Sequence, residues 1–220
     1  MKREILITKD GSTTIYMPEI NESYHSKHGA IQEAYHVFIN MGLNLFSQNT
    51  IFILEMGFGT GLNAFITFLE AQKNDKIIDY VGVEAYPVIN EEVKCMNYVK
   101  ELQATDQETV FNEMHQCTWN EKHFISKNFC LSKRQQLFED ITDENCYDLI
   151  YFDAFGFAVQ PSLWNEELFA KMYKSLKSKG VLVTYACRTS IKNAMLSSGF
   201  SVEKLPGAPG KREMLRATKN

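Results

Sequence analysis

A short apolar run followed at once by a glycine-rich turn is the feature that most restricts the fold of this chain. The run is Ile51–Leu54, and the turn is Glu55-Met56-Gly57-Phe58-Gly59-Thr60-Gly61. A run without polar alternation is typical of a strand buried on both faces, as in a parallel sheet. Glycines at alternate positions allow positive φ angles and let a ligand approach the backbone closely. The sequence therefore predicts a ligand-binding turn at the carboxyl end of a buried strand.

The rest of the chain alternates between strand-like and helix-like segments. Further strands are predicted at Tyr80–Val83, Phe129–Ser132, Tyr147–Asp153, Val181–Ala186, Phe200–Leu205 and Met214–Ala217. Helices are predicted at Gly29–Met41, Leu62–Gln72, Asn90–Leu102, Asn165–Leu176 and from an N-cap at Thr189 to Ser198. Residues 103–128 lack a clear period and are interpreted as helix and loop. This alternation predicts a doubly wound α/β sheet of order 3-2-1-4-5, closed by a terminal antiparallel hairpin.

The first 45 residues have a different pattern from the rest. Alternating runs at Glu4–Thr8 and Ser12–Tyr16 flank Lys9-Asp10-Gly11, which is a hairpin signal. We expect residues 1–45 to form a hairpin and helix extension that acts as a lid, and residues 46–220 to form one domain. A chain of 220 residues with 45% apolar content is long enough for one sizeable core.

Composition narrows the class of protein. The formal net charge of −4 does not indicate a globally basic nucleic-acid binder. The five cysteines are scattered singly without C-x-x-C spacing, so no metal site is expected. The amino terminus lacks the apolar segment of a secretory signal, and no apolar run approaches the roughly 18 residues of a membrane span. We therefore expect a cytoplasmic protein without membrane segments.

The spacing of the turn discriminates between cofactors. A dinucleotide fingerprint is G-x-G-x-x-G, whereas this turn has the pattern E-x-G-x-G-x-G and places Leu62 at the third-glycine position. S-adenosylmethionine has no pyrophosphate but carries an ammonium and a sulfonium, which suit an acid such as Glu55. The alternative is a tight turn without ligand, but three alternate glycines plus an acid exceed what a turn needs. The sequence thus predicts S-adenosylmethionine as cofactor.

Two polar residues are further cofactor candidates. Glu84 ends the second strand about twenty residues past the turn, where a carboxylate can accept hydrogen bonds from ribose hydroxyls. The alternative for Glu84 is a solvated acid at a strand end. Asn63 has two equal interpretations, a hydrogen bond to the cofactor or a cap on the following helix.

The end of the fourth strand is the candidate acceptor side. Asp153 ends this strand beside the first one, next to the expected sulfonium. If the acceptor is an amine, a carboxylate here can hold its N–H groups and stabilise developing positive charge; an ordinary polar strand end is the alternative. Aromatic residues follow at Phe155, Phe157 and Trp164. They either stack on a flat base or cover the next helix.

Four ordered motifs carry a family resemblance. EMGFGTGLNAF, DAFGFAVQPSLWNEELF, GAPGKREMLRA and the upstream segment Tyr24–Glu33 resemble the bacterial tRNA 5-methylaminomethyl-2-thiouridine methyltransferase family, over about residues 20–218. The resemblance implies a class I S-adenosylmethionine-dependent methyltransferase fold and a tRNA partner. It implies N-methylation of the aminomethyl group of a wobble uridine, giving 5-methylaminomethyl-2-thiouridine.

The resemblance also implies roles for individual residues. Cofactor-binding residues would be Glu55, Gly57, Phe58, Gly59, Gly61, Asn63 and Glu84, with Tyr24, Ser26 and Glu33 closing over the methionine end. Asp153 and Phe155 would lie at the reaction centre, and Phe157, Trp164, Lys211 and Arg212 would bind the substrate. For the basic C-terminal loop the alternative to a phosphate grip is a solvated edge.

Two departures from the family and several rival functions remain. Many relatives fuse this domain to an FAD-dependent oxidoreductase; because the chain ends at Asn220, we expect another protein to supply that step. Leu131–Leu137 offers no clear acceptor for the adenine amine.

YDLIYFDAF and GVLV also resemble aminopropyltransferases, although a polyamine site needs more acids. A small-molecule or protein methyltransferase and a non-catalytic cofactor-binding module are further alternatives; intact Glu55, Glu84 and Asp153 argue against the module.

Overall fold

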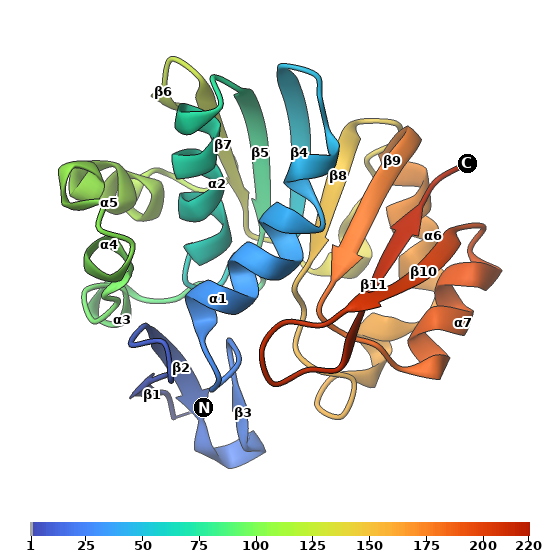
Figure 1. Cartoon of the computed structure of the whole chain (residues 1–220), viewed down its shortest axis with the longest axis horizontal. Coiled ribbons are helices and arrows are strands. Elements are labelled where there is room, and N and C mark those ends of the chain that lie inside the picture. Colours follow the sequence, from blue (N-terminus) through green and yellow to red (C-terminus); the bar gives the residue numbers. More distant parts are fainter. Residues whose placement is uncertain (1) are drawn as a thin grey trace.

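The computed structural model describes residues 2–220 and shows a large sheet and a small one (Figure 1). The strands of the large sheet are β4 (Thr50–Met56), β5 (Ile77–Val83), β6 (Lys122–Ser126), β7 (Phe129–Arg134), β8 (Tyr147–Phe152), β9 (Leu176–Thr184), β10 (Ser201–Pro206) and β11 (Glu213–Thr218). Their order is β10-β11-β9-β8-β4-β5-β7-β6. The five central strands β7, β5, β4, β8 and β9 run parallel to one another. Strand β11 is antiparallel to both of its neighbours, β9 and β10. The predicted order 3-2-1-4-5 and the terminal hairpin are confirmed.

Helices cover both faces of the large sheet (Figure 1). They are α1 (Ala30–Ala34), α2 (Leu62–Lys73), α3 (Asn90–Val93), α4 (Tyr98–Glu101), α5 (Glu108–Gln116), α6 (Glu166–Ser175) and α7 (Thr189–Ser197). A π-helical turn at Tyr35–Asn40 continues α1, so the first predicted helix is confirmed with an irregular second half. One hydrophobic cluster joins the sheet to α2 and this turn, and a second joins it to α6 and α7.

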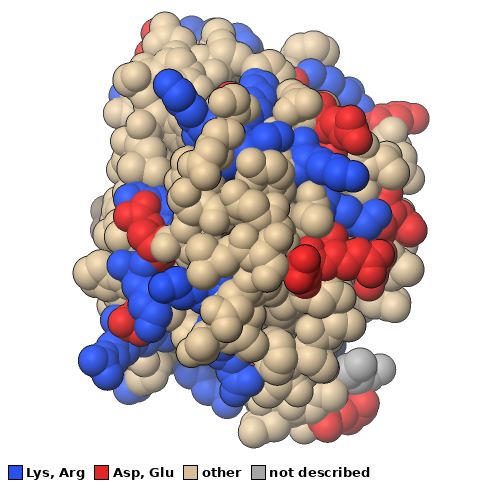
Figure 2. All heavy atoms as spheres, turned by 90° about the vertical axis from the view of Figure 1, so that its right-hand side faces the viewer, with Lys and Arg blue, Asp and Glu red and all other residues tan. Residues whose placement is uncertain are grey.

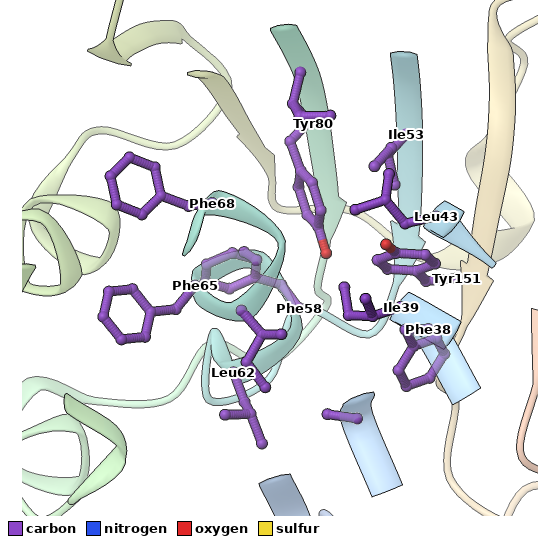
Figure 3. Packing of buried hydrophobic residues seen from close by; sticks show 14 of the residues in the cluster. Phe38, Ile39, Leu43, Ile53, Phe58, Leu62, Phe65, Phe68, Tyr80 and Tyr151 are labelled. Carbon is purple, nitrogen blue, oxygen red and sulfur yellow. The ribbon is translucent and has the colours of Figure 1, made fainter. Parts of the chain in front are cut away.

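Residues of β4 alternate between these two clusters because successive strand side chains point to opposite faces. Ile53 packs in the first cluster and Leu54 in the second. Figure 3 shows the first cluster, where Tyr80 and Tyr151 extend from the sheet toward the residues of α2 and the π-helical turn. Glu55 follows Ile53 in the same row of β4. The strand geometry therefore places an acidic side chain behind the glycine turn, on a buried face.

The small sheet forms the amino-terminal extension. It consists of β1 (Glu4–Ile7), β2 (Thr13–Met17) and β3 (Glu22–Ser23), and β1 and β2 form the predicted hairpin. Asn97, in the turn between α3 and α4, holds this extension. Its Nδ2 donates to the carbonyl of Gly11, and its Oδ1 accepts from the backbone N–H of Thr13, each at 2.8 Å. The role of residues 1–45 as a lid stays a prediction.

Three local predictions were wrong. The helix predicted at Asn90–Leu102 is two short helices, because the chain turns at Asn97 to contact the hairpin. Residues 103–128 include β6, an antiparallel edge strand that the irregular pattern did not reveal. Thr189 is the first residue of α7, and Arg188 occupies the N-cap position. No helix within residues 2–220 combines the length and apolar character needed to cross a membrane.

Candidate active site

A cavity of about 270 Å³ opens at the carboxyl ends of the parallel strands. Its walls come from segments far apart in the sequence: the amino-terminal extension, the glycine turn, the ends of β5, β7 and β8, and the residue after β9. The lining includes Tyr24, His25, Gly57, Phe58, Gly59, Asn63, Glu84, Phe138, Asp153, Phe155 and Tyr185. This is the position at which ligands bind in open α/β sheets.

The glycine turn forms one wall. Gly57, Gly59 and Gly61 have φ angles of +99°, +49° and +70°, which side chains with a Cβ rarely adopt. A Cβ on Gly57 would lie 2.7 Å from the carbonyl oxygen of Asp153. The missing side chain therefore lets the turn pass against the end of β8. Gly61 does not line the cavity; it caps α2 in a left-handed conformation.

Phe58 has a structural role that the motif alone did not reveal. Its ring lies against Gly82 on β5, where a Cβ would come within 2.4 Å of it. The ring also contacts His115 and Trp119 edge-on, with centroids 5.9 and 6.2 Å away. Phe58 touches the cavity but is 3% exposed, so it mainly fixes the turn on the sheet.

Glu84 connects the turn to the second strand of the parallel series. Its Oε2 accepts a hydrogen bond from the backbone N–H of Gly59 at 3.1 Å, and its Oε1 accepts one from the backbone N–H of Tyr86 at 2.9 Å. The side chain lines the cavity, and each oxygen retains a second lone pair. Its contact with ribose hydroxyls stays a prediction that this geometry permits.

Asn63 bridges two carboxyl groups behind the turn. Its Nδ2 lies 2.9 Å from Oε1 of Glu55 and 2.9 Å from Oδ2 of Asp153. The capping interpretation of Asn63 was wrong, because Gly61 occupies the N-cap position and Asn63 is the second residue of α2. The amide instead fixes the orientation of Asp153 in the cavity.

Glu55 does not face the cavity. It is fully buried, and Asn63 lies between it and the open space. Burial raises the pKa of the Glu55 carboxyl well above its usual range, against the lowering effect of the hydrogen bond from Asn63. The expectation that Glu55 meets a cationic cofactor group directly was therefore wrong. Its position makes it a support for Asn63.

Asp153 lies at the end of β8 and faces the cavity. Burial and, to a smaller extent, the nearby carboxylate of Glu33 raise its pKa to about 7, against the lowering effects of Asn63 and Lys211. A carboxyl group with a pKa near neutral can exist with or without its proton under the same conditions. The structure thus places a carboxyl group that can exchange a proton near neutral pH beside the glycine turn.

Residues of the amino-terminal extension form the roof. Tyr24 contacts Phe155 edge-on at 5.1 Å, and burial raises the pKa of its hydroxyl to about 12. Glu33 does not line the cavity; it accepts a hydrogen bond from the backbone N–H of Ser26 at 2.9 Å and pairs with Lys211. Ser26 is likewise outside the lining. Both residues therefore support the roof and have no direct place in the cavity.

The aromatic segment after Asp153 divides into three different environments. Phe155 lines the cavity, whereas Phe157 lies in a neighbouring groove. Trp164 is 2% exposed, packs on Phe152 at 5.1 Å and donates its indole N–H to the carbonyl of Phe155 at 2.8 Å. Stacking of Trp164 on a base was a wrong expectation because its ring is enclosed by the second cluster.

The two basic residues predicted to bind substrate also differ. Lys211 pairs with Glu33, and its Nζ lies 3.7 Å from the ring centre of Tyr185; the residue is half-buried and also lines the neighbouring groove. Arg212 is exposed in the neighbouring groove. Binding of phosphate by these two residues stays a prediction, and Arg212 is the more exposed of the two.

Sequence reasoning missed several lining residues. Tyr185 follows β9, and its hydroxyl donates to the carbonyl of Ala154 at 2.8 Å. His25 contacts Thr14 and Thr60, and burial lowers its pKa to about 4. Phe138 lies in the segment after β7. The rule that ligands bind at strand ends points to Tyr185 and Phe138, but no local pattern marks His25.

These features define a class I S-adenosylmethionine-dependent methyltransferase fold. Its glycine turn has no room for a Cβ at Gly57. The profile described as S-adenosyl-L-methionine-dependent methyltransferase (Methyltransf_30) matches residues 100–220, and the chain belongs to this family. S-adenosylmethionine is accordingly the cofactor. The glycine turn and Glu84 line the cavity and remain the residues predicted to bind this cofactor.

Curated relatives indicate the part of a larger protein to which the chain corresponds. It is similar to the "tRNA 5-methylaminomethyl-2-thiouridine biosynthesis bifunctional protein MnmC" of Leptospira borgpetersenii, with 29% identity over 89% of this chain and 32% of the relative. The protein of the same name from Campylobacter fetus is 28% identical over 93% of this chain and 34% of the relative. The chain thus spans about a third of the length of these relatives.

Solved structures support the fold. The structure titled MNMC2 from Aquifex aeolicus has a TM-score of 0.75 at 20% identity, covering 100% of this chain and 71% of that one. Spermidine synthase from Thermotoga maritima has a TM-score of 0.58 at 13% identity, covering 99% of this chain and 69% of that one. At these identities the likeness concerns the fold alone.

Proposed function

We propose that the protein methylates the aminomethyl nitrogen of 5-aminomethyl-2-thiouridine at the tRNA wobble position, giving 5-methylaminomethyl-2-thiouridine. The names of the curated relatives support this substrate. The observation that carries the proposal is the geometry of Asp153. It faces the cavity opposite the glycine turn, is held by Asn63, and has a pKa raised to about 7.

Asp153 handles the proton of the acceptor amine. When bound, S-adenosylmethionine supplies a methyl group on sulfur; the sulfur–carbon bond breaks, its electron pair stays on sulfur, and a carbon–nitrogen bond forms. The amine must enter neutral, because a protonated nitrogen has no lone pair. The Asp153 carboxylate accepts an N–H hydrogen bond, stabilises the positive charge that develops on nitrogen, and takes the proton that the product ammonium releases.

The remaining predicted site residues take complementary roles in this proposal. The glycine turn and Glu84 bind the cofactor, and Phe155 lies against the acceptor. Residues 1–45 act as the lid, with Tyr24 as the part that contacts ligand and Glu33 as the part that holds the lid to the C-terminal loop. The pairing of Glu33 with Lys211 and the contact of Tyr24 with Phe155 support this division.

Transfer of label tests the proposal. Purified protein with methyl-labelled S-adenosylmethionine is expected to label tRNA that carries 5-aminomethyl-2-thiouridine, and nuclease digestion followed by mass spectrometry should place the methyl group on the aminomethyl nitrogen. The same tRNA without the aminomethyl group is the control substrate. Label found only in small amines would favour a small-molecule methyltransferase, label found only in protein would favour a protein methyltransferase, and either result would contradict the tRNA assignment.

Substitution of Asp153 tests its role. The variant Asp153→Asn is expected to lower turnover by about 10²- to 10³-fold, while cofactor affinity measured by calorimetry stays nearly unchanged. For the wild type, kcat/KM should rise as pH increases through about 7, because the raised pKa keeps Asp153 protonated below that value. This limb should disappear in Asp153→Asn. The exposed acid Asp106 provides the control variant Asp106→Asn. Equal losses of turnover and cofactor affinity would instead assign Asp153 to the cofactor.

A further inference from the structure

A second hollow adjoins the active-site cavity. It is an open groove of about 420 Å³, whose lining includes Gly156, Phe157, Tyr185, Cys187, Arg188 and Arg212. Tyr185 lines both spaces, and the segment after Asp153 runs from one to the other, with Phe155 in the cavity and Phe157 in the groove. A polymer whose reactive unit enters the cavity would therefore extend into this groove.

The groove has a local surplus of free positive charge. Arg188 and Arg212 are exposed, and neither forms an ion pair with a carboxylate among residues 2–220. The one acid in the lining, Glu213, pairs with Lys204 at 3.0 Å. Figure 2 shows basic side chains gathered toward the lower left of this side of the molecule, although the whole chain has a net charge of −4. Such a local surplus attracts a polyanion.

A flat aromatic surface lies beside these charges. The guanidinium carbon of Arg188 lies 5.0 Å from the ring centre of Phe157, which is half-buried. A planar guanidinium over an aromatic ring can stack on a base and also donate paired hydrogen bonds to a phosphate. An acidic peptide would use the charges but would leave the aromatic surface without a matching flat group. The combination favours a nucleotide over a peptide.

We infer that this groove binds the nucleotide next to the target uridine, with Arg188 and Arg212 on its phosphates and Phe157 against its base. The inference rests on the proposed function. A base can reach Asp153 only when it is turned out of its stack, and enzymes that act on such bases contact the flanking nucleotides. Single-stranded loops allow this geometry because their bases are unstacked and can lie on aromatic side chains.

RNA binding by charge-reversal variants tests the groove. The probe is a fluorescent anticodon stem-loop RNA carrying 5-aminomethyl-2-thiouridine, and the readout is anisotropy over a range of salt concentrations. The double variant Arg188→Glu/Arg212→Glu is expected to bind roughly tenfold more weakly or worse at about 0.15 M salt. Its plot of log affinity against log salt should be shallower by about 0.7 for each phosphate that the variant no longer neutralises. Phe157→Leu should weaken binding by roughly fivefold or more without changing that slope.

The matched control is Lys174→Glu, a reversal of an exposed charge on α6, near the amino ends of the strands. Calorimetry with S-adenosylmethionine should give the same affinity for all variants, which shows that they remain folded. If the groove variants bind the RNA as tightly as the Lys174→Glu control does and the wild type methylates it, the groove is not the nucleotide-binding site. The proposed function would then still stand. A wild type that neither binds nor methylates the RNA would overturn the proposed function and the groove together.

Discussion

The two rims of the active-site cavity are built in different ways. The glycine rim consists of residues 57–60 and Glu84, which follow directly from β4 and β5; backbone N–H groups of the turn donate to the carbonyl of Val83 and to the carboxylate of Glu84. The loop rim consists of residues 24–25, 153–163 and Tyr185, which come from three distant parts of the chain. The loop rim is joined by side-chain contacts such as Tyr24 to Phe155 and by the ion pair that links Lys211 to Glu33 behind it.

This difference separates a shared function from a specific one. The glycine rim is built from two neighbouring parallel strands and the turn after the first of them, and we expect it to bind the cofactor whatever the methyl acceptor is. We expect the loop rim to select the acceptor, because its residues can change without disturbing the parallel sheet. Binding residues commonly lie on loops positioned by a rigid scaffold, and here the scaffold carries the turn itself. Substitutions in the two rims should therefore differ in their effects on folding.

The largest contrast is expected between Gly57→Ala and Gly156→Ala. A Cβ on Gly57 would meet the carbonyl oxygen of Asp153 at 2.7 Å, with φ at +99°. We expect its free energy of unfolding to fall by about 2–3 kcal/mol and cofactor binding to weaken at least tenfold. In the loop rim, a Cβ on Gly156 would find its nearest neighbour, Glu22, at 3.4 Å, so the control should change stability by less than about 0.5 kcal/mol. Urea denaturation and calorimetry measure both quantities; equal effects would refute the contrast.

Acid sensitivity provides a comparison in which the two rims should behave alike. His25 supports the loop rim and His115 lies behind the glycine rim, and burial lowers the pKa of each from 6.5 to about 4. The unfolded chain takes up these protons below about pH 6.5 and the folded protein only near pH 4. Stability should therefore fall between those values, by about 1–3 kcal/mol for each histidine.

Denaturation curves of His25→Gln and His115→Gln at about pH 7 and about pH 4.5 measure this loss, and each variant should remove part of the pH dependence. A pH dependence identical to that of the wild type in both variants would show that other groups are responsible.

The ion pair behind the loop rim should have an intermediate effect. Lys211→Met leaves the carboxylate of Glu33, which is 7% exposed, without its cation. We expect a loss of about 1–3 kcal/mol in the free energy of unfolding, because an unpaired buried charge is costly. The double variant Lys211→Met/Glu33→Leu should recover part of this loss. Strict additivity of the two substitutions in a double-mutant cycle would show that the pair does not couple the extension to the C-terminal loop.

The smallest effect is expected for a second lysine–glutamate ion pair, which lies at the surface. Lys204 and Glu213 lie 3.0 Å apart, with side chains 44% and 36% exposed. Lys204→Ala should change the free energy of unfolding by about 0.5 kcal/mol or less, since water and salt screen exposed pairs. Thermal denaturation at low and high salt measures it. A loss as large as that in Lys211→Met would show that burial is not what distinguishes the two pairs.

Most of the fold could be predicted from local sequence patterns, with errors that have physical causes. Buried strands such as β4 and β8 were recognised because continuous apolar runs require cover on both faces. The helix predicted at Asn90–Leu102 failed because its break at Asn97 depends on hydrogen bonds to Gly11 and Thr13, more than 80 positions away. The strand β6 was missed because its edge position leaves residues such as Phe124 exposed and the polar pattern irregular.

The candidate site also has a part that local patterns predict and a part that depends on distant contacts. The glycine turn, Glu84 and Asp153 could be placed at one edge of the sheet because parallel strands end together there. Burial could not be predicted in the same way. Glu55 and Trp164 belong to conspicuous motifs, yet both side chains are enclosed and support their neighbours, Asn63 and Phe155.

The sequence by itself determined the positions of the buried strands, the glycine turn and hence the class of cofactor, because these depend on residues that are close along the chain and on the period of apolar positions. Only the tertiary structure decided which residues enclose the acceptor. Glu33 and Lys211 are 178 positions apart, and Tyr24, Asp153 and Tyr185 meet at one cavity only after the sheet has formed. The physical reason is that exposure and charge pairing depend on neighbours in space, which local spacing does not specify.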